Sequence, residues 1–502
     1  MIRKKANAVR LFAVIIVLCA CLFSTAQQLV LRGDYPDPSV IRIGDTYWAS
    51  ATTSNWAPAY PILKSKDLVH WTTVSHVFMK LPEWADYYFW APELSYEKGK
   101  VYVYYAAHKK GGNLCVGVAS ADRPEGPYTD HGPLVCQEDG SIDAFPMRDE
   151  NGKLFLIWKE DANSIGKPTP IWAQELNEER TKLIGEKKEL FRNDVPWENN
   201  LVEGVSMVRH GGYFYAFYAA AGCCGAACTY GVGVARSNSL LGPWEKNPGN
   251  PVLTTNDKWN CPGHGTPVDK DGRHYFMYHA YDKKNTVFTG REGLLTEYKF
   301  TPGGWIEFVK ETPVSDVPVK NVSDHFDGNT LGKEWQWSVF QQPKYMVRSG
   351  ELLLNAGQEP GNFLAQKTIT GDYTASVKLD LQKSTANGGI AIIGDEKNLV
   401  ALVYRENAFH LLQVKDGNEI ELSQKPLSLG KQCYLQIKVK GANNASFYFS
   451  TDGKKYFVIN STPIDIKYLP PWDRAVRAGV IAHGANDKQA VFDDFKIENK
   501  KH

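Results

Sequence analysis

Five times, this chain of 502 residues repeats a glycine-led turn followed by an aromatic-rich strand. The turn glycines are spaced 55, 53, 60 and 60 residues apart, at Gly44, Gly99, Gly152, Gly212 and Gly272. A fixed period near this length, with several short strands in each unit, is typical of a propeller in which each repeat forms one blade. Radial repetition brings equivalent positions of all blades to one axis. The sequence therefore predicts an all-β fold that gathers side chains from distant segments.

A second recurring sequence motif supports these repeat boundaries. A serine, a turn and an aromatic residue that opens the next strand recur at residues 65–71, 120–128 and 237–244. Together the two patterns predict five blades that begin near Asp37, Trp90, Ile142, Val202 and Gly263. The charged stretch 175–188 has the composition of a helix, but a long hairpin within the third blade fits the repeat better.

The repeat stops after Trp305, and a linker containing two prolines follows at residues 311–318. From about Val322 the chain alternates in short runs without a repeat, which is typical of a β-sandwich. We therefore predict a five-bladed β-propeller over residues 27–312 and a β-sandwich over residues 322–502.

Residues 1–26 are predicted to be a signal peptide. A basic start precedes the apolar stretch 11–23, which is too short to span a bilayer, and Ser24-Thr25-Ala26 offers small residues for cleavage. This segment predicts a secreted or periplasmic protein, with a lipoprotein as the alternative because residues 18–21 loosely resemble a lipobox. No later stretch is apolar enough for a membrane helix, and a net charge of +1 gives no reason to expect a nucleic-acid partner.

Seven cysteines follow the predicted signal: Cys115, Cys136, Cys223, Cys224, Cys228, Cys261 and Cys433. Export makes disulfides the first interpretation, with free thiols and a zinc site as alternatives. Cys115 and Cys136 flank one blade segment and are candidates to pair. An odd number leaves one thiol over, for which Cys433 is the natural candidate.

Three carboxylates occupy equivalent positions in separate repeats. Asp37 lies between two prolines, Asp143 follows Gly140-Ser141-Ile142, and Glu203 sits between apolar residues and Gly204. Each alone is as well explained by a turn aspartate or an ion-paired acid. An acid that enters an apolar, inward-running strand is costly unless it is paired or functional, so the shared phase of all three indicates chemistry.

Cleavage of a glycosidic bond by an enzyme commonly needs two carboxyl groups. One carboxylic acid protonates the leaving oxygen while an ionised carboxylate activates water. A third carboxylate would raise the pKa of the acid by like-charge repulsion and keep it protonated. The chain has no Gly-x-Ser-x-Gly elbow, no His-Glu-x-x-His and no phosphate-binding loop, so competing chemistries fit less well.

Several motifs, in order along residues 30–310, resemble those of glycoside hydrolase family 43. They are Tyr35-Pro36-Asp37-Pro38-Ser39, Trp90-Ala91-Pro92-Glu93, Ser141-Ile142-Asp143, Val202-Glu203-Gly204, Gly263-His264-Gly265 and Gly290-Arg291-Glu292. The resemblance implies an inverting mechanism with Asp37 as general base, Glu203 as general acid and Asp143 as the group that tunes and orients the acid. It implies substrate contacts from Trp90, Phe145, Arg291 and His264. No cofactor is expected to be required, and the resemblance implies that His264 lies at the axis near either a water or a structural cation such as calcium.

The second domain resembles the concanavalin-like sandwich that follows some propellers of this family, on residues 325–335, 449–453 and 490–495. It is expected to bind sugar, to wall the active site or to act as a brace. The whole chain is predicted to be an exo-acting glycosidase that releases terminal α-L-arabinofuranosyl residues from plant cell-wall polysaccharide. A β-D-xylosidase of the same family is the close alternative, and a sugar-binding protein without catalysis is the alternative of another class. Residues 54–61 and 223–230 are expected to form the rim of a closed pocket.

Overall fold

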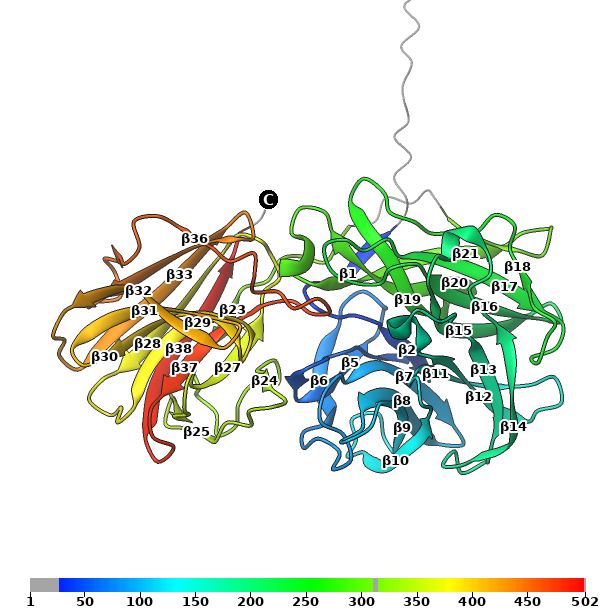
Figure 1. Cartoon of the computed structure of the whole chain (residues 1–502), viewed down its shortest axis with the longest axis horizontal. Coiled ribbons are helices and arrows are strands. Elements are labelled where there is room, and N and C mark those ends of the chain that lie inside the picture. Colours follow the sequence, from blue (N-terminus) through cyan, green and yellow to red (C-terminus); the bar gives the residue numbers. More distant parts are fainter. Residues whose placement is uncertain (1–26, 310–314, 501–502) are drawn as a thin grey trace, which may run out of the picture.

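A computed structural model of the chain describes residues 27–309 and 315–500. The predicted signal segment, residues 1–26, lies outside the described residues. Figure 1 shows two lobes: one runs from blue to green along the sequence and the other from yellow to red. Strands make up both lobes, and the prediction of an all-β propeller followed by a β-sandwich is confirmed.

The first lobe consists of five antiparallel sheets, one for each sequence repeat. The first sheet contains β2 (Ser39–Ile43), β3 (Thr46–Ser50), β5 (Ala59–Ser65) and β6 (Thr72–Phe78). The second contains β7 (Trp90–Glu97), β8 (Lys100–His108), β9 (Leu114–Ala121) and β10 (Thr129–Cys136). The third contains β11 (Ser141–Arg148), β12 (Leu154–Glu160), β13 (Ile171–Leu176) and β14 (Leu183–Phe191). The fourth contains β15 (Val202–His210), β16 (Tyr213–Ala220), β17 (Gly231–Ser237) and β18 (Glu245–Lys246). The fifth contains β19 (Trp259–Lys270), β20 (Arg273–Asp282), β21 (Arg291–Phe300), β22 (Ile306–Phe308) and, from the start of the chain, β1 (Gln28–Leu31).

The first strands of the five sheets close a ring. β2 contacts β7, β7 contacts β11, β11 contacts β15, β15 contacts β19, and β19 contacts β2 again. The pairing of β1 with β21 joins the start of the lobe to its last blade, a closure that the repeat pattern did not predict. The predicted hairpin in blade three is confirmed, because β13 and β14 pair antiparallel from Leu176 opposite Leu183.

Aromatic side chains fill the space between neighbouring blades. Phe217 of blade four stacks on Phe276 of blade five, for example, with ring centroids 4.7 Å apart. Rings of this size each bury a large apolar area, which is why the repeat carries them on its strands. The wedge-shaped layers between blades thereby hold the inner strands around the axis.

The second lobe packs two sheets face to face around the largest apolar cluster of the described residues. The larger sheet contains β23 (Val322–Asp324), β25 (Tyr345–Arg348), β26 (Glu351–Asn355), β28 (Tyr373–Asp380), β33 (Gln432–Lys440), β34 (Asn444–Ser450), β35 (Phe457–Val458), β36 (Ile464–Asp465) and β38 (Gln489–Asn499). The smaller contains β27 (Asn362–Lys367), β29 (Asn387–Asp395), β30 (Asn398–Arg405), β31 (Ala408–Lys415), β32 (Asn418–Pro426) and β37 (Arg477–His483). Strand β28 alternates buried and half-buried residues along its length, the pattern of a sheet with one face in the core.

Polar and apolar contacts join the two lobes. Strand β4 (Trp56–Ala57) of the propeller pairs with β24 (Trp337–Ser338) of the sandwich. Trp56 is buried in an apolar cluster with residues of the smaller sheet, including Phe363. Next to it, the guanidinium of Arg477 donates to the buried carboxylate of Asp34 at 3.0 Å. A desolvated ion pair of this kind is costly to break, so the lobes are held in one orientation.

Three disulfides join Cys115 to Cys136, Cys223 to Cys224, and Cys228 to Cys261. The disulfide interpretation of the cysteines is therefore confirmed. Cys433 is buried and alone among the described cysteines is unpaired, as predicted. The short 3-10 helices of the described residues are η1 (Ala162–Ile165), η2 (Pro196–Glu198) and η3 (Thr286–Phe288). In the part of the chain that the structure describes, no helix has the length and apolarity needed to cross a membrane.

Candidate active site

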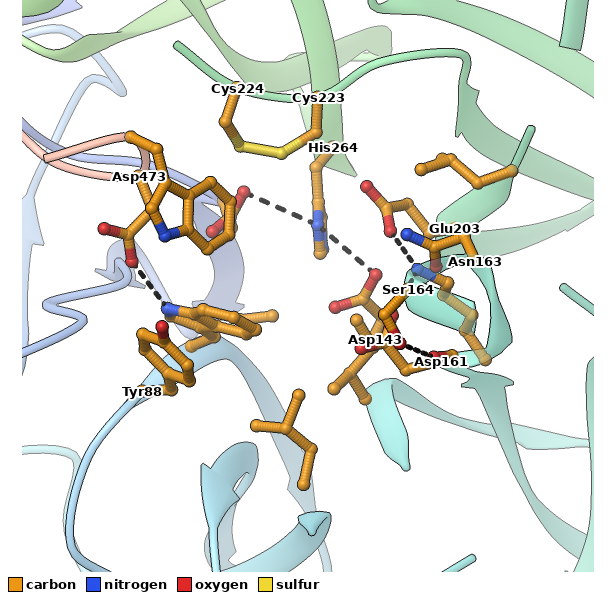
Figure 2. Close-up of a pocket in the computed structure, with 18 of the residues that line it drawn as sticks. Tyr88, Asp143, Asp161, Asn163, Ser164, Glu203, Cys223, Cys224, His264 and Asp473 are labelled. Atoms are coloured by element: carbon orange, nitrogen blue, oxygen red, sulfur yellow. Dashed lines mark hydrogen bonds and ion pairs between the residues drawn. A yellow bond between two sulfur atoms is a disulfide. The ribbon is translucent and has the colours of Figure 1, made fainter. Parts of the chain in front are cut away.

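A cavity of about 600 Å³ opens at the ring of first strands. It is lined by six of the seven side chains that the sequence singled out: Asp37, Trp90, Asp143, Glu203, His264 and Arg291. Figure 2 shows Asp143, Glu203 and His264 projecting into this space from different ribbons. The structure thus brings the three predicted carboxylates together from blades one, three and four.

A recurring backbone device turns these side chains toward the axis. The pairing of the first strand with the second shifts register between Ile142 and Phe145 in blade three and between Glu203 and Ser206 in blade four. The residue at or next to each candidate group has a positive φ, which is 51° at Asp37, 57° at Asp143 and 61° at Gly204. Bulges of this kind bend a strand and re-aim its side chains, and they cluster beside functional sites.

Gly204 is needed at its position for a second reason. A Cβ there would lie only 2.8 Å from Cγ of His264, closer than carbon atoms can approach. The glycine therefore lets blades four and five meet at the axis, which places Glu203 beside His264.

Asp37 is held ionised by a dense set of partners. Its Oδ1 accepts from Arg291 Nη1 at 3.1 Å and its Oδ2 from the hydroxyl of Thr52 at 2.6 Å. Its backbone N–H donates to Nδ1 of His279 at 3.0 Å. Burial alone would raise the pKa of Asp37, but Arg291, His279 and His264 together hold it well below its ordinary value. Asp37 can therefore accept a proton from water but does not carry one.

Glu203 is buried between a lysine and a tyrosine. Lys159 Nζ donates to its Oε2 at 2.5 Å, and the hydroxyl of Tyr230 donates to its Oε1 at 2.7 Å. Burial favours the neutral form of Glu203, but Lys159 and Tyr230 outweigh this and lower its pKa. Lys159 also donates to Asp161 at 2.8 Å, so this buried ammonium is shared by two carboxylates.

For Asp143, the effects that raise the pKa outweigh those that lower it. Burial raises its pKa to about 6, and the negative charge of Glu203 adds to this while His264 opposes it. Its Oδ2 accepts from the N–H of Gly204 at 2.8 Å and lies 3.9 Å from Nδ1 of His264. The sequence predicted that Asp143 would raise the pKa of Glu203. In the cavity as it stands the net pKa of Glu203 is lowered instead, because the positive charge of Lys159 and the hydrogen bonds from Lys159 and Tyr230 outweigh the effects that raise it.

Trp90 forms one wall of the cavity together with residues of the second lobe. Tyr88 stacks on Trp90 at 4.3 Å, and Trp472 meets it edge-on at 5.7 Å. The indole N–H of Trp90 donates to Oδ2 of Asp473 at 3.1 Å. Trp472 and Asp473 lie in the loop between β36 and β37, so the sandwich supplies part of this wall, one of the roles expected for it.

Asp473 also contacts Arg291, the residue that donates to Asp37. Its backbone carbonyl accepts from Arg291 Nη2 at 2.9 Å, while Arg291 Nη1 contacts Asp37. The side chain of Asp473 accepts from Arg474 at 2.6 Å and contacts Ser54 of the propeller. One loop of the second lobe therefore fixes both Arg291 and Trp90.

Phe145 is not among the side chains that line the cavity, and the predicted substrate contact is corrected. It lies beyond the bulge of β11 and packs on the apolar cluster between blades three and four. The register shift after Ile142 turns Asp143 toward the axis and leaves Phe145 in the layer between blades. Of the two segments expected at the rim, 223–230 contributes Cys223, Cys224 and Tyr230, whereas none of 54–61 lines the cavity.

The expected structural calcium near His264 stays a prediction. Among residues 27–309 and 315–500, no three histidine, cysteine or acidic side chains are grouped so as to hold a metal ion. The carboxylates near His264 have hydrogen-bond partners within the protein, since Asp37 accepts from Arg291 and Thr52 and Asp143 accepts from the Gly204 N–H. We therefore assign no step of the chemistry to a cation.

Sequence reasoning missed several residues that shape the cavity: Thr52, Lys159, His279, Trp472 and Asp473. It placed Tyr230 at the rim but missed its contact with Glu203. Lys159 carried a usable signal, because it follows the wholly apolar run 154–158 and is only 1 % exposed. Asp473 follows Pro470-Pro471-Trp472, an unusual run, but nothing in the sequence places that loop beside the propeller axis.

The cavity and the fold have counterparts among known proteins. The family profile "Glycosyl hydrolases family 43" matches residues 26–306, and the profile "Beta xylosidase C-terminal Concanavalin A-like domain" matches residues 323–498. A non-reducing end alpha-L-arabinofuranosidase of Bacteroides ovatus is 25% identical over 476 residues, which cover 84% of this chain and 83% of that protein. A xylan 1,3-beta-xylosidase of a Vibrio species is 27% identical over 418 residues, covering 72% of this chain and 75% of the other.

Solved structures extend the likeness to both lobes. The crystal structure of a family 43 protein from Bacillus licheniformis superposes with a TM-score of 0.80 at 26% identity, covering 94% of this chain and 99% of that one. A xylan beta-1,4-xylosidase from Bacillus halodurans superposes with a TM-score of 0.79 at 24% identity, over 94% and 99% of the two chains.

Proposed function

This chain belongs to glycosyl hydrolase family 43 and is a glycoside hydrolase, and from that premise we propose that it removes terminal α-L-arabinofuranosyl residues from plant cell-wall polysaccharide with inversion. Asp37 is the general base and Glu203 the general acid in this proposal. The observation that carries it is the presence of two buried carboxylates with different partners in one cavity of about 600 Å³. That volume suits a small saccharide unit.

In the proposed reaction, Asp37 takes a proton from a water molecule as the water attacks the anomeric carbon. Its pKa is well below the ordinary value, so it is ionised throughout the neutral and mildly acidic range. Arg291, which donates to Asp37, keeps that carboxylate in place. Glu203 delivers a proton to the leaving oxygen on the other side of the scissile bond, and inversion follows because no covalent intermediate forms.

Glu203 must carry a proton to act as the acid. Because its pKa is lowered, Glu203 in the free enzyme carries a proton only at a pH below the ordinary pKa of a glutamic acid. A bound saccharide excludes water from the cavity, and that desolvation raises the pKa of a buried carboxyl. We therefore expect kcat, which reports the pKa of the acid in the substrate complex, to fall as the pH rises toward neutrality. Asp143, with a pKa of about 6, orients the acid and adds its own charge as the pH approaches neutrality.

The sugar is the open choice within this function. The arabinofuranosidase of Bacteroides ovatus supports release of arabinose. A β-D-xylosidase is the second candidate, supported by the second lobe, whose matching profile is named for the C-terminal domain of beta xylosidases. Both sugars are pentoses of similar overall size, and either would meet the walls formed by Trp90 and Trp472.

The test compares aryl α-L-arabinofuranoside with aryl β-D-xyloside by release of the phenol. We expect the arabinofuranoside to have the higher kcat/KM, and NMR of the first-formed sugar to show the inverted anomer. An Asp37→Asn variant should lose turnover of both substrates, since an amide cannot take the proton from water. Preference for the xyloside would establish the second candidate, and unchanged turnover in Asp37→Asn would overturn the base assignment.

We also propose that the protein acts outside the cytoplasm, in the periplasm or the medium. Three disulfides suit an oxidising compartment, and residues 1–26 have the pattern of a signal peptide. Mass spectrometry of the protein from its native host tests this, with Gln27 expected as the first residue. A retained Met1 in the mature protein would contradict it.

A further inference from the structure

A disulfide between the adjacent residues Cys223 and Cys224 lines the catalytic cavity. Figure 2 shows the bond at the edge of the cavity, on the same side as His264. Its loop joins β16 to β17 and leads into Tyr230, whose hydroxyl donates to Glu203. Neither the proposed acid–base chemistry nor the fold accounts for a disulfide at this place.

Stability does not explain it. A disulfide stabilises a fold chiefly by shortening the loop that it closes in the unfolded chain, and the effect grows with the length of that loop. Cys223 and Cys224 are separated by one position, compared with 33 for Cys228 and Cys261. The vicinal bond therefore removes little freedom from the unfolded chain.

The loop also has other anchors. Cys228 ties it to β19 through Cys261. The backbone N–H of Gly222 donates to the Thr229 hydroxyl at 3.0 Å, and the Thr229 N–H donates back to the Gly222 carbonyl at 2.9 Å. Gly225 N–H donates to the hydroxyl of Tyr281 at 3.1 Å. These contacts hold the loop in place without the vicinal bond.

What the vicinal bond does provide is a surface. Two thiols would bring S–H groups into the cavity, whereas the disulfide has no donor and presents polarisable sulfur. Cys223 packs on the apolar cluster that includes Leu201 and Tyr230. Both cysteines are half-buried, so one side of the bond rests on this cluster and the other is open to the cavity.

A sugar ring has matching faces. Its hydroxyl groups need the charged residues of the cavity, such as Asp143, Lys159 and Arg291, while its C–H face is apolar. Trp90 supplies one apolar wall. We propose that the Cys223–Cys224 disulfide is a second apolar wall of the sugar-binding cavity, which packs against the bound saccharide so that the oxidised enzyme has the higher affinity. This proposal rests on the glycosidase function proposed above.

The test measures kcat and KM on the better aryl glycoside before and after treatment with dithiothreitol under native conditions. We expect reduction to raise KM about ten-fold, equivalent to about 1.4 kcal/mol, and to leave kcat within about two-fold. A Cys223→Ala/Cys224→Ala variant should have a similarly raised KM before treatment and no further response to the reductant.

Two variants serve as controls. Cys115→Ala/Cys136→Ala removes a disulfide whose cysteines do not line the cavity, and Cys228→Ser/Cys261→Ser removes the anchor of the same loop. In both, dithiothreitol should still raise KM. A response that disappears in the Cys228→Ser/Cys261→Ser variant but persists in Cys223→Ala/Cys224→Ala would overturn the proposal, since the anchor would then be the sensitive bond.

The outcomes separate this proposal from the function on which it rests. An untreated enzyme without turnover of any glycoside would contradict the proposed function itself. If the enzyme is active and its KM is unchanged by both the reductant and the double alanine substitution, only the proposed role of the vicinal disulfide is overturned. Because the reductant acts on folded wild-type enzyme, the test does not depend on how well the variants fold.

Discussion

Asp37 and Glu203 are both buried and both contact a buried cation, but their surroundings come from different parts of the molecule. Arg291, which holds Asp37, is itself held by the carbonyl of Asp473 in the sandwich. Lys159 and Tyr230, which hold Glu203, both belong to the propeller. The base side of the cavity thus depends on two lobes and the acid side on one.

The type of cation differs as well. The guanidinium of Arg291 stays charged at any accessible pH, and its planar fork can donate to Asp37 and to the Asp473 carbonyl at once. Lys159 is a compact charge at the end of a flexible stem, fixed here by Glu203 and Asp161. The comparison indicates that the base is kept ionised by a cation that does not titrate, while the pKa of the acid is lowered chiefly by Lys159.

The largest expected effect is a difference between variants of the acid and of the base in how their kcat/KM depends on the leaving group. For a saccharide leaving group, Glu203→Gln should lower kcat/KM by about 10³-fold, which lies in the range for general acid catalysis. For a dinitrophenyl glycoside, whose leaving group needs no proton, the loss should be about ten-fold or less. Asp37→Asn should lower kcat/KM by about 10³-fold for both substrates, because every leaving group needs the water to be activated.

Steady-state kinetics on the two substrates measure this difference. Glu203→Asp provides a control that keeps the acid but shortens it. Equal losses for both leaving groups in Glu203→Gln would show that Glu203 is not the proton donor and would remove the acid side of the comparison.

The next largest effect is that of Lys159→Met on the pH profile. Removing the ammonium raises the pKa of Glu203, and a general acid works only while it is protonated. The limb of kcat/KM that falls with rising pH should therefore move to higher pH. The buried carboxylates of Glu203 and Asp161 also lose their partner, so the free energy of unfolding should fall by about 3 kcal/mol.

Lys159→Arg is the matched control, because it keeps the charge and should keep the position of that limb. If the Lys159→Met enzyme is destabilised but has an unchanged pH profile, Lys159 serves only as a structural ion-pair partner.

The sequence predicted what depends on repetition. Asp37, Asp143 and Glu203 stand at one phase of successive repeats, and a propeller brings such positions together, so their meeting in one cavity followed from the period alone. The two sheets of the second lobe followed likewise from the loss of the repeat and the alternating strands after Val322.

What the sequence did not predict depends on contacts outside the repeat. Asp473 lies more than 160 residues beyond the last blade, and no period relates it to Arg291. Phe145 was misplaced because the bulge after Ile142 changes the alternation of side chains by a local backbone conformation. The lowered pKa of Glu203 depends on Lys159, which lies 44 positions away in another blade.

A smaller effect is expected for Asp473→Ala, which tests the dependence of the base side on the sandwich. The Trp90 indole N–H and Arg474 each lose one acceptor and keep the Ser54 hydroxyl as the other, and the loop that presents the carbonyl to Arg291 loosens. We expect kcat/KM to fall about twenty-fold, since a misplaced group near the chemistry costs up to about 10². Asp487→Ala, at an exposed site of the same lobe, should leave kcat/KM unchanged.

Kinetics and thermal unfolding of both variants are the measurements. An Asp473→Ala enzyme with wild-type kcat/KM would show that the propeller alone positions Arg291, and the contrast between the two sides of the cavity would disappear.

The smallest effect is expected for Trp472→Ala, which distinguishes surface contact from positioning within the same loop. Trp472 is 53% exposed and touches Trp90 only edge-on, so its removal should change the unfolding free energy by no more than about 0.5 kcal/mol. As a wall for the saccharide it should affect binding: KM should rise about five-fold with kcat unchanged, as expected when uniform binding is lost. Trp472→Phe should restore most of the affinity. A fall in kcat at constant KM would instead mean that Trp472 acts through Trp90 and Asp473, and the loop would then serve the base side by positioning alone.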